Sequence, residues 1–312
     1  MTTHPATGAV VVGIDPDGSS DAALDWAADD AARRHRPLLL LAAPAPLYSD
    51  PMAGAIALLP ATESLGPVLD RAAARVAERA PSVEVRRTTA YLAAASPAAP
   101  LTEVSRVADT VVVGSHGRGR LATLLMGSVS QSVAAGAGCP VVVVREAPRV
   151  LAPETPRHVV VGVDGSPVSA EAVGYAFAQA DARGVALTVL HGWDPERTVP
   201  PPGPIETRWR AAAQEEDMLT WTAIAGWRER LPDVPVRVRV RQWSPVEALL
   251  AEADQAELLV VGSHGWGDVR GLLLGSVSQA VLRRSPVPVA VVRPRDTAQA
   301  GDGSRVQAVV AT

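Results

Sequence analysis

The sequence predicts an α/β protein with two similar halves, each an open parallel sheet with helices on both faces. Three observations support this prediction. Short apolar runs rich in valine alternate with longer stretches of helical periodicity, which is the pattern of βαβ units. The run at residues 10–15 recurs at 159–164, 149 positions later. A glycine pattern, Gly-x-x-Gly and then Gly-Ser after nine further residues, also occurs twice, 148 positions apart.

These repeats set the domain limits that we expect. The first domain covers residues 8–146 and the second covers 157–295. Three prolines lie between them, so residues 147–156 are typical of a linker. The tail, 296–312, is rich in small and polar residues, and we expect it to be disordered. A length of 312 residues agrees with two domains, because one domain commonly takes about 100–200 residues.

In the first repeat, strands and helices are predicted in strict alternation. The first and fourth apolar runs are unbroken, which indicates strands at the buried centre of a parallel sheet. Ser96 and Pro97 are expected as the N-cap and first residue of the third helix. The predicted strands are 10–14, 38–42, 83–91, 110–113 and 141–144, and the predicted helices are 20–35, 62–80, 96–108 and one that begins at about 128.

The second repeat follows the same plan. Its third strand reads Val-Pro-Val-Arg-Val-Arg-Val-Arg, and a proline with strict alternation suits an edge strand that has one face in water. Ser244 and Pro245 are expected to open its third helix. The predicted strands are 159–163, 186–190, 234–241, 258–261 and 289–292.

The repeated motifs lie where a ligand site is expected. Ligands of open parallel sheets bind at the carboxyl ends of the strands, where the strand order reverses. If the first and fourth strands are central neighbours, Asp15 and Gly114 emerge side by side there, as do Asp164 and Gly262. Glycines after a buried strand let backbone N–H groups converge on a phosphate, and a helix N-terminus at the Gly-Ser pair attracts anions.

Composition excludes several kinds of chemistry. All 29 basic residues are arginine, which excludes mechanisms that need a P-loop lysine, a lysine Schiff base or an adenylated lysine. A net charge of −4 does not indicate a nucleic-acid surface. Cys139 is the single cysteine, which favours a reducing compartment. Since neither a signal-peptide pattern nor a membrane-length apolar run is present, we expect a cytoplasmic protein without membrane insertion.

The glycine loops carry a family resemblance. Val-Val-Val-Gly-Ser-His-Gly-Arg-Gly with Met-Gly-Ser-Val-Ser, and its second copy, resembles the ATP-binding motif of universal stress proteins. The Val-Gly-(Ile/Val)-Asp strands and the Cys-Pro-Val strand entry at 139–141 fit the same family, and the resemblance covers residues 8–295. It implies two tandem Rossmann-like domains, each an open five-stranded parallel sheet of order 3-2-1-4-5. It also implies an internal pseudo-dimer whose final strands pair antiparallel.

The resemblance further implies which residues bind ATP, and magnesium is expected with the nucleotide. In the first repeat they are Gly13, Asp15, Pro44, Gly114, Ser115, His116, Gly117, Arg118, Gly119, Arg120, Gly127, Ser128 and Val129. In the second repeat they are Gly162, Asp164, Gly192, Gly262, Ser263, His264, Gly265, Trp266, Gly267, Gly275, Ser276 and Val277. No catalytic residue and no protein ligand to a metal are assigned.

The two predicted sites differ in their charge. Trp266 stands where the first loop has Arg118, and Asp268 stands where it has Arg120. Losing two cations and gaining an anion near the phosphates weakens binding electrostatically, so we expect the first site to be the tighter one.

The resemblance also implies that Pro44 and Gly192 take the position whose backbone meets adenine, where the family often has valine.

Alternative interpretations of these residues stay open. The glycines could form tight turns only, and Asp15 and Asp164 could cap the helices that follow them. His116 and His264 occupy equivalent loop positions, for which we prefer a hydrogen bond on the phosphate side to acid–base catalysis. The arginines of the first loop suit phosphate contacts, with solvated charges as the alternative.

Three functions are compatible with the sequence. The first is an ATP-binding regulatory protein of the stress response, in which occupancy biases conformation, homodimer formation or the choice of a protein partner. The second is a slow ATPase or nucleotide-transfer enzyme on the same fold, although neither His-x-Gly-His nor Ser-Gly-Gly-x-Asp-Ser is present. The third is an interaction scaffold that binds no nucleotide, against which the intact glycine motifs argue.

Overall fold

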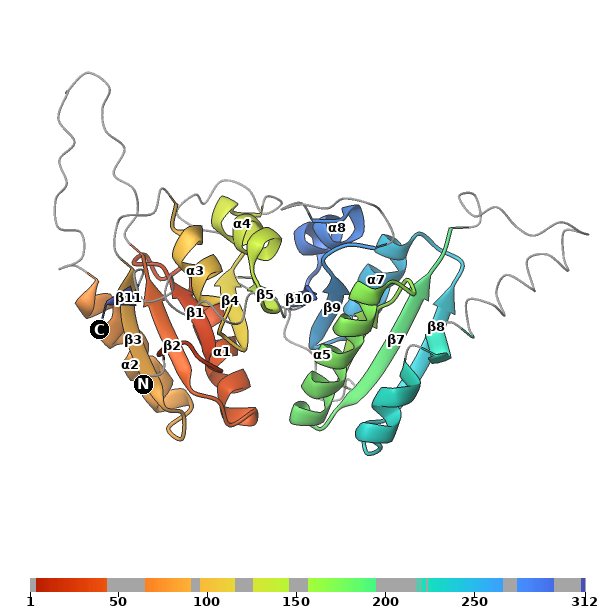
Figure 1. Cartoon of the computed structure of the whole chain (residues 1–312), viewed down its shortest axis with the longest axis horizontal. Coiled ribbons are helices and arrows are strands. Elements are labelled where there is room, and N and C mark those ends of the chain that lie inside the picture. The colour runs from red at the N-terminus through yellow and green to blue at the C-terminus, as the bar shows by residue number, and fades with distance from the viewer. Residues whose placement is uncertain are drawn as a thin grey trace, which may run out of the picture. The chain divides into compact units, whose positions relative to one another are not determined.

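The computed structural model forms two compact units (Figure 1). The first comprises residues 1–147 with 295–312, and the second comprises 148–294. The domain limits of 8–146 and 157–295 that the repeats suggest stay a prediction. The residues that the structure describes are 4–43, 65–90, 96–115, 126–145, 157–194, 218, 220–222, 224–265, 274–294 and 310–311.

The first unit contains a parallel sheet in the order β3-β2-β1-β4-β5, which confirms the predicted order 3-2-1-4-5. The central strand β1 pairs with β2 on one side and β4 on the other. Its valines have no exposed surface, as expected for an apolar run covered on both faces. The strands are β1 (Val10–Ile14), β2 (Leu38–Ala42), β3 (Val85–Ala90), β4 (Thr110–Gly114) and β5 (Val141–Val144).

Helices pack on both faces of this sheet. In the first helix, leucine and alanine residues at helical spacing are buried, together with Asp30, which pairs with Arg34. Helix α1 contacts α2, and α3 contacts α4. The helices are α1 (Asp21–Arg33), α2 (Gly66–Arg79), α3 (Ala98–Val104) and α4 (Ser128–Gly136).

The third helix is shorter than the predicted span of 96–108. It begins at Ala98 with Pro97 as its N-cap, so the prediction that Ser96 is the N-cap was wrong by one residue. The Ser96 Oγ accepts a hydrogen bond from the Ala98 N–H at 3.2 Å, which still supports the first turn. After Val104 the chain continues to residue 108 in hydrogen-bonded turns rather than in a regular helix.

The second unit has the same topology, in the order β8-β7-β6-β9-β10. Strand β8 pairs with β7 alone among the described residues of this unit, which confirms that the Val-Arg alternation belongs to an edge strand. The strands are β6 (His158–Gly162), β7 (Ala186–Gly192), β8 (Val236–Arg241), β9 (Leu258–Gly262) and β10 (Val289–Val292), and the helices are α5 (Pro167–Arg183), α7 (Pro245–Ala253) and α8 (Ser276–Arg284).

The helix starts in this unit follow the sequence signals closely. Ser166 is the N-cap of α5, and its hydroxyl accepts a hydrogen bond from the Ser169 N–H at 3.2 Å. Ser244 is the N-cap of α7 and Pro245 is its first residue, as predicted. Gly184 ends α5 in the left-handed conformation that favours glycine, with φ of 62°.

The end of the chain departs from the prediction of a disordered tail. Val310–Ala311 forms a short strand, β11, which pairs antiparallel with Ala90 and Thr89 at the end of β3. An edge strand offers unpaired backbone N–H and C=O groups, which gives a physical reason for this pairing. The rest of the tail, 296–309 and 312, lies outside the described residues.

Candidate functional site

Within each unit, the strand order brings the aspartate motif and the glycine motif together at the carboxyl ends of the strands. Strand β1 is parallel to β4, with Val12 opposite Val112, and β6 is parallel to β9, with Val161 opposite Val260. The carboxyl ends of these two strands therefore meet in each unit. This is the point of strand-order reversal at which open α/β sheets bind ligands.

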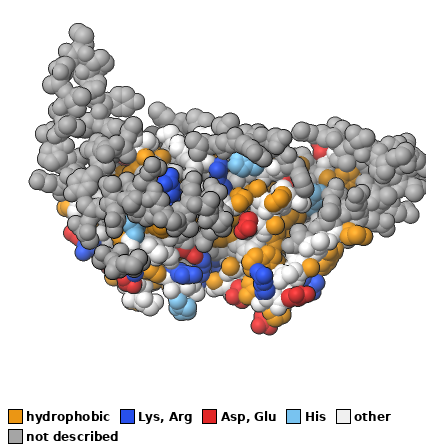
Figure 2. Space-filling view, viewed as in Figure 1, with side chains coloured by type: hydrophobic (Ala, Val, Ile, Leu, Met, Phe, Trp, Pro, Cys, Tyr) orange, Lys and Arg blue, Asp and Glu red, His pale blue; other side chains and the backbone are white. Residues whose placement is uncertain are grey.

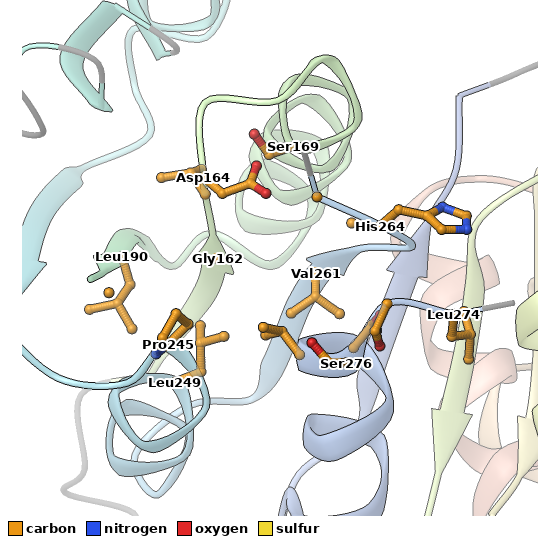
Figure 3. Close-up of a pocket in the computed structure, with 17 residues that line it drawn as sticks. Gly162, Asp164, Ser169, Leu190, Pro245, Leu249, Val261, His264, Leu274 and Ser276 are labelled. Atoms are coloured by element: carbon orange, nitrogen blue, oxygen red, sulfur yellow. The ribbon is translucent and has the colours of Figure 1, made fainter. Parts of the chain in front are cut away.

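A cavity of about 470 Å³ lies at this point in the second unit (Figure 3). Residues from the ends of β6, β7 and β9 and from the starts of α5, α7 and α8 line it. The predicted residues that it brings together are Gly162, Asp164, Gly192, Gly262, His264, Gly265, Gly275, Ser276 and Val277. Ser263 is fully buried beside them and is not part of the lining.

One side of the cavity is an apolar wall that the site prediction did not include. It consists of Leu190, Pro245, Leu249 and Val261, and Leu274 lies farther along the lining (Figure 3). The remaining unpredicted lining residues are Val163, Ser169 and Ser278. Strand alternation could have identified Leu190, because it lies two residues before Gly192 and side chains two residues apart share a face. No sequence signal connects α7 with the strand ends.

Two glycines let α7, which contributes Pro245 and Leu249 to this wall, pack close to the ends of β6 and β7. A Cβ atom on Gly192 would be 2.8 Å from the Pro245 Cα, and one on Gly162 would be 3.0 Å from a Leu249 methyl group. The first contact involves backbone and does not yield easily. These glycines therefore have a packing role at the cavity, whether or not they contact a ligand.

In each unit, hydrogen bonds join the residues at the two ends of the glycine loop, and we call these residues the neck of the loop. In the second unit, the Gly275 N–H donates to the Ser263 carbonyl at 2.8 Å, and the Ser278 hydroxyl donates to the same carbonyl at 3.0 Å. In the first unit, the Gly127 N–H donates to the Ser115 carbonyl, also at 2.8 Å. The repeated Gly-Ser pair thus begins a helix directly above the strand end in both units.

Three helix N-termini surround the cavity of the second unit. Residues in the first turns of α5, α7 and α8 line it, namely Ser169, Pro245 and Ser276. Helix N-termini carry partial positive charge and unpaired N–H groups, so this arrangement favours an anionic group.

Asp164 lies between α5 and the glycine loop. Its Oδ1 accepts a hydrogen bond from the Ser166 N–H at 3.0 Å, while a Cβ atom on Gly265 would overlap its Oδ2. Any larger residue would require the loop or the carboxylate to shift. The N-caps are Ser20 and Ser166, so the alternative that the two aspartates are N-caps is wrong.

His264 is held by its neighbour. Its Nδ1 lies 2.8 Å from the Ser263 Oγ, and its Nε2 is buried and has no hydrogen-bond partner among the described residues. Figure 3 shows its ring pointing away from the wall of Leu190, Pro245 and Leu249. The apolar wall and the imidazole therefore serve different parts of any ligand.

The first unit repeats this arrangement as far as it is described. Asp15 follows β1, and its N–H donates to the Ser20 hydroxyl at 3.0 Å. Its described site residues are Gly13, Asp15, Gly114, Ser115, Gly127, Ser128 and Val129. The predicted residues Pro44, His116, Gly117, Arg118, Gly119, Arg120, Trp266 and Gly267 lie outside the described residues.

The described surface gives little indication of other partners. On the face drawn in Figure 2, acidic and basic side chains are interspersed rather than gathered by sign. Arg75 and Arg79 of α2, for example, pair with Asp25 and Asp29 of α1. None of the helices in the described ranges is long and apolar enough to cross a membrane.

Comparisons with known proteins give consistent results. The model of the universal stress protein family matches residues 7–145 and 155–293. The universal stress protein Rv2005c of Mycobacterium tuberculosis is 39% identical over 290 residues, which cover 91% of this chain and 96% of that protein. A universal stress protein from Archaeoglobus fulgidus has a similar fold, with a TM-score of 0.62 and 20% identity over 91% of this chain and 98% of that chain. A universal stress protein solved in complex with cAMP is 34% identical, with a TM-score of 0.29 over 44% of this chain and 96% of that chain.

Proposed function

Because the chain belongs to the universal stress protein family, we propose that each unit binds an adenine nucleotide and that occupancy regulates the protein in the stress response. The nucleotide is ATP, held between the first and fourth strands. Occupancy acts by biasing conformation, oligomeric state or the choice of a protein partner.

The cavity of the second unit is the observation that carries this proposal. Its volume of about 470 Å³ lies within the usual range of ligand pockets, about 300–1,000 Å³. It joins an apolar wall, which suits a flat base, to three helix N-termini, which suit phosphates. The carboxylate of Asp164 lies beside the loop and suits the hydroxyl groups of a ribose.

The residues present also fit a triphosphate bound without lysine. The backbone N–H groups of Ser276 and Val277, at the start of α8, are the proposed donors to the phosphates. Magnesium held by the phosphates would supply positive charge at this site. In the first unit, Ser128 and Val129 take the place of Ser276 and Val277.

The proposal extends to the whole chain. Two sites per chain are expected, and the first is the tighter because its loop has Arg118 and Arg120. We place the protein in the cytoplasm, with the two repeats packed as an internal pseudo-dimer. The cytoplasmic location and the pseudo-dimer are inferred from the sequence and the family.

Nucleotide binding is tested with the purified full-length protein. Mass spectrometry of protein prepared without added nucleotide identifies any ligand that co-purifies, and calorimetry measures binding of ATP, ADP, AMP and cAMP. We expect two binding events per chain for ATP with magnesium. No bound ligand and no heat at millimolar concentrations of any of these nucleotides would reject the proposal.

An enzyme is distinguished from a regulator by turnover. We expect at most slow hydrolysis of ATP, because no catalytic residue is assigned at either site. Steady turnover faster than about 1 per second, at the low end of ordinary enzymes, would favour an enzyme instead.

A further inference from the structure

One buried charge near the second site has no role in the arrangement described so far. Arg293 directly follows β10 and is half-buried. Its Nε and Nη2 atoms are shielded from solvent, and they have no hydrogen-bond partner within the described part of the chain. Burial also lowers the pKa of this guanidinium.

Arg293 lies next to the neck of the second glycine loop. Strand β10 is paired with β9, with Val292 opposite Gly262. The Ser263 N–H donates to the Val292 carbonyl at 2.8 Å. Arg293 is the next residue after Val292. In the same ladder Val291 is opposite Val261, which lines the cavity. Side chains two residues apart on an extended chain share a face, so Arg293 is placed on the same face of the sheet as Val291 and Val261, just outside the residues that line the cavity.

A second buried nitrogen without a hydrogen-bond partner in the described part of the chain belongs to His264, the residue after Ser263. Ser263 is connected to Val292 through its N–H and to His264 through its hydroxyl, which lies 2.8 Å from the imidazole Nδ1. This leaves the His264 Nε2 buried, like the two Arg293 nitrogens, without a partner in the described ranges. In the tautomer in which the Ser263 hydroxyl donates to Nδ1, the ring proton lies on Nε2 and can be donated to an anion.

Buried guanidinium groups require compensation. Removing a charge from water is unfavourable unless an opposite charge or hydrogen-bond acceptors replace the water. A phosphate supplies both, since it accepts two parallel hydrogen bonds from the planar guanidinium fork. The helix N-termini already favour an anion at this site, so a phosphate is the group that satisfies both features.

We propose that Arg293, assisted by His264, binds the terminal phosphates of the nucleotide in the second unit and makes that site selective for di- and triphosphates. This inference rests on the proposed function, because it concerns the same site. It adds a side-chain cation from the end of β10 to the backbone N–H groups at the start of α8.

The duplication supports the assignment. Arg145 follows β5 just as Arg293 follows β10, and the two are 148 positions apart, the same offset as the loop glycines. The Ser115 N–H donates to the Val144 carbonyl at 2.8 Å, which repeats the bond between Ser263 and Val292. Both glycine loops are therefore accompanied by an arginine at the same position of the ladder.

The test compares ligands that differ only in their number of phosphates. Adenosine, AMP, ADP and ATP are titrated into the full-length wild type and into Arg293→Gln, Arg293→Lys and Arg237→Gln. The last variant is the matched control, because it removes one exposed arginine from the edge strand β8. Tryptophan fluorescence follows the second site, since six of the seven tryptophans lie in the second repeat and Trp266 lies in its loop.

In Arg293→Gln, we expect the Kd for ATP and ADP to rise about 10- to 100-fold, which corresponds to the loss of a charged hydrogen bond. The Kd for adenosine should stay unchanged, and Arg293→Lys should lose less affinity than Arg293→Gln. Arg237→Gln should bind all four ligands like the wild type.

Other outcomes overturn the inference. If Arg293→Gln weakens adenosine and ATP equally, or if Arg293→Lys and Arg293→Gln melt at a lower temperature without any phosphate-dependent change in Kd, Arg293 is a structural residue. If the wild type binds ATP and Arg293→Gln binds it equally well, the inference fails while the proposed function stands. A wild type that binds no nucleotide rejects both.

Discussion

At the scale of single residues, Gly265 gives the most direct test of the site. The loop passes Asp164 so closely that a Cβ atom would overlap the carboxylate. We expect Gly265→Ala to displace the loop at a cost of about 1–3 kcal/mol, and so to weaken ATP binding at the second site about 5- to 150-fold. Fluorescence titration measures this change.

The matched control is Gly66→Ala, because a Cβ atom there has no neighbour within 4 Å. This variant should bind ATP like the wild type. Equal affinities for Gly265→Ala and Gly66→Ala would contradict the placement of the loop against Asp164.

The residues of the site differ in how far sequence predicts them. Gly262, Asp164 and Ser276 could be predicted because each belongs to a repeated motif at the end of a strand or the start of a helix. Leu249 and Pro245 could not, since they reach the cavity only through the packing of α7 against β7. Arg293 lies outside the glycine pattern. Only the structure shows that its Nε and Nη2 atoms are buried without a hydrogen-bond partner among the described residues.

At the scale of secondary-structure elements, Gly174 joins α5 to the helical residues 224–230. A Cβ atom on Gly174 would overlap the ring of Trp227, which also stacks on Phe177 with ring centroids 6.3 Å apart. We expect Gly174→Ala to lower the melting temperature by several degrees, because overpacking costs about 1–3 kcal/mol. Calorimetry or circular dichroism measures the shift.

Gly226→Ala is the control for this prediction. Gly226 is also helical, but a Cβ atom there has no neighbour within 4 Å. Alanine stabilises a helix by up to about 1 kcal/mol relative to glycine, so this variant should melt at the same or a higher temperature. A Gly174→Ala protein as stable as Gly226→Ala would show that the Trp227 ring moves away freely.

Strands were predicted more accurately than helix ends. The apolar runs that became β1, β2, β5 and β10 begin and end as expected, because a buried strand must be apolar along its whole length. Strand β7 extends to Gly192, two residues beyond the prediction, because pairing with β8 continues past the apolar run. Helix ends such as that of α3 depend on tertiary contacts that local sequence does not reveal.

At the scale of the whole molecule, the C-terminal strand protects an edge. In the first unit, β11 pairs with the last two residues of β3. We expect a chain that ends at residue 309 to self-associate more than the full chain, because the exposed β3 edge offers unpaired backbone groups. Light scattering after size-exclusion chromatography measures the mass. A chain that ends at 311 retains β11 and should behave like the full-length protein.

The duplicated chain also carries its own comparison of the two sites. Two of the positions at which the loops differ change the charge beside the Gly-x-x-Gly motif, where the first loop has Arg118 and Arg120 and the second has Trp266 and Asp268. We expect the double substitution Trp266→Arg and Asp268→Arg to bring the second site to about the affinity of the first, since it restores two cations beside the phosphates.

The gain should shrink as salt is raised, because exposed charges are screened beyond about 8 Å at physiological ionic strength. The reverse change, Arg118→Trp with Arg120→Asp, should weaken the first site by a similar factor. Calorimetry of both double variants at low and high salt measures these effects. If neither exchange changes the difference in affinity between the sites, that difference arises from the scaffold that the two units do not share, such as β11, rather than from the charge of the loops.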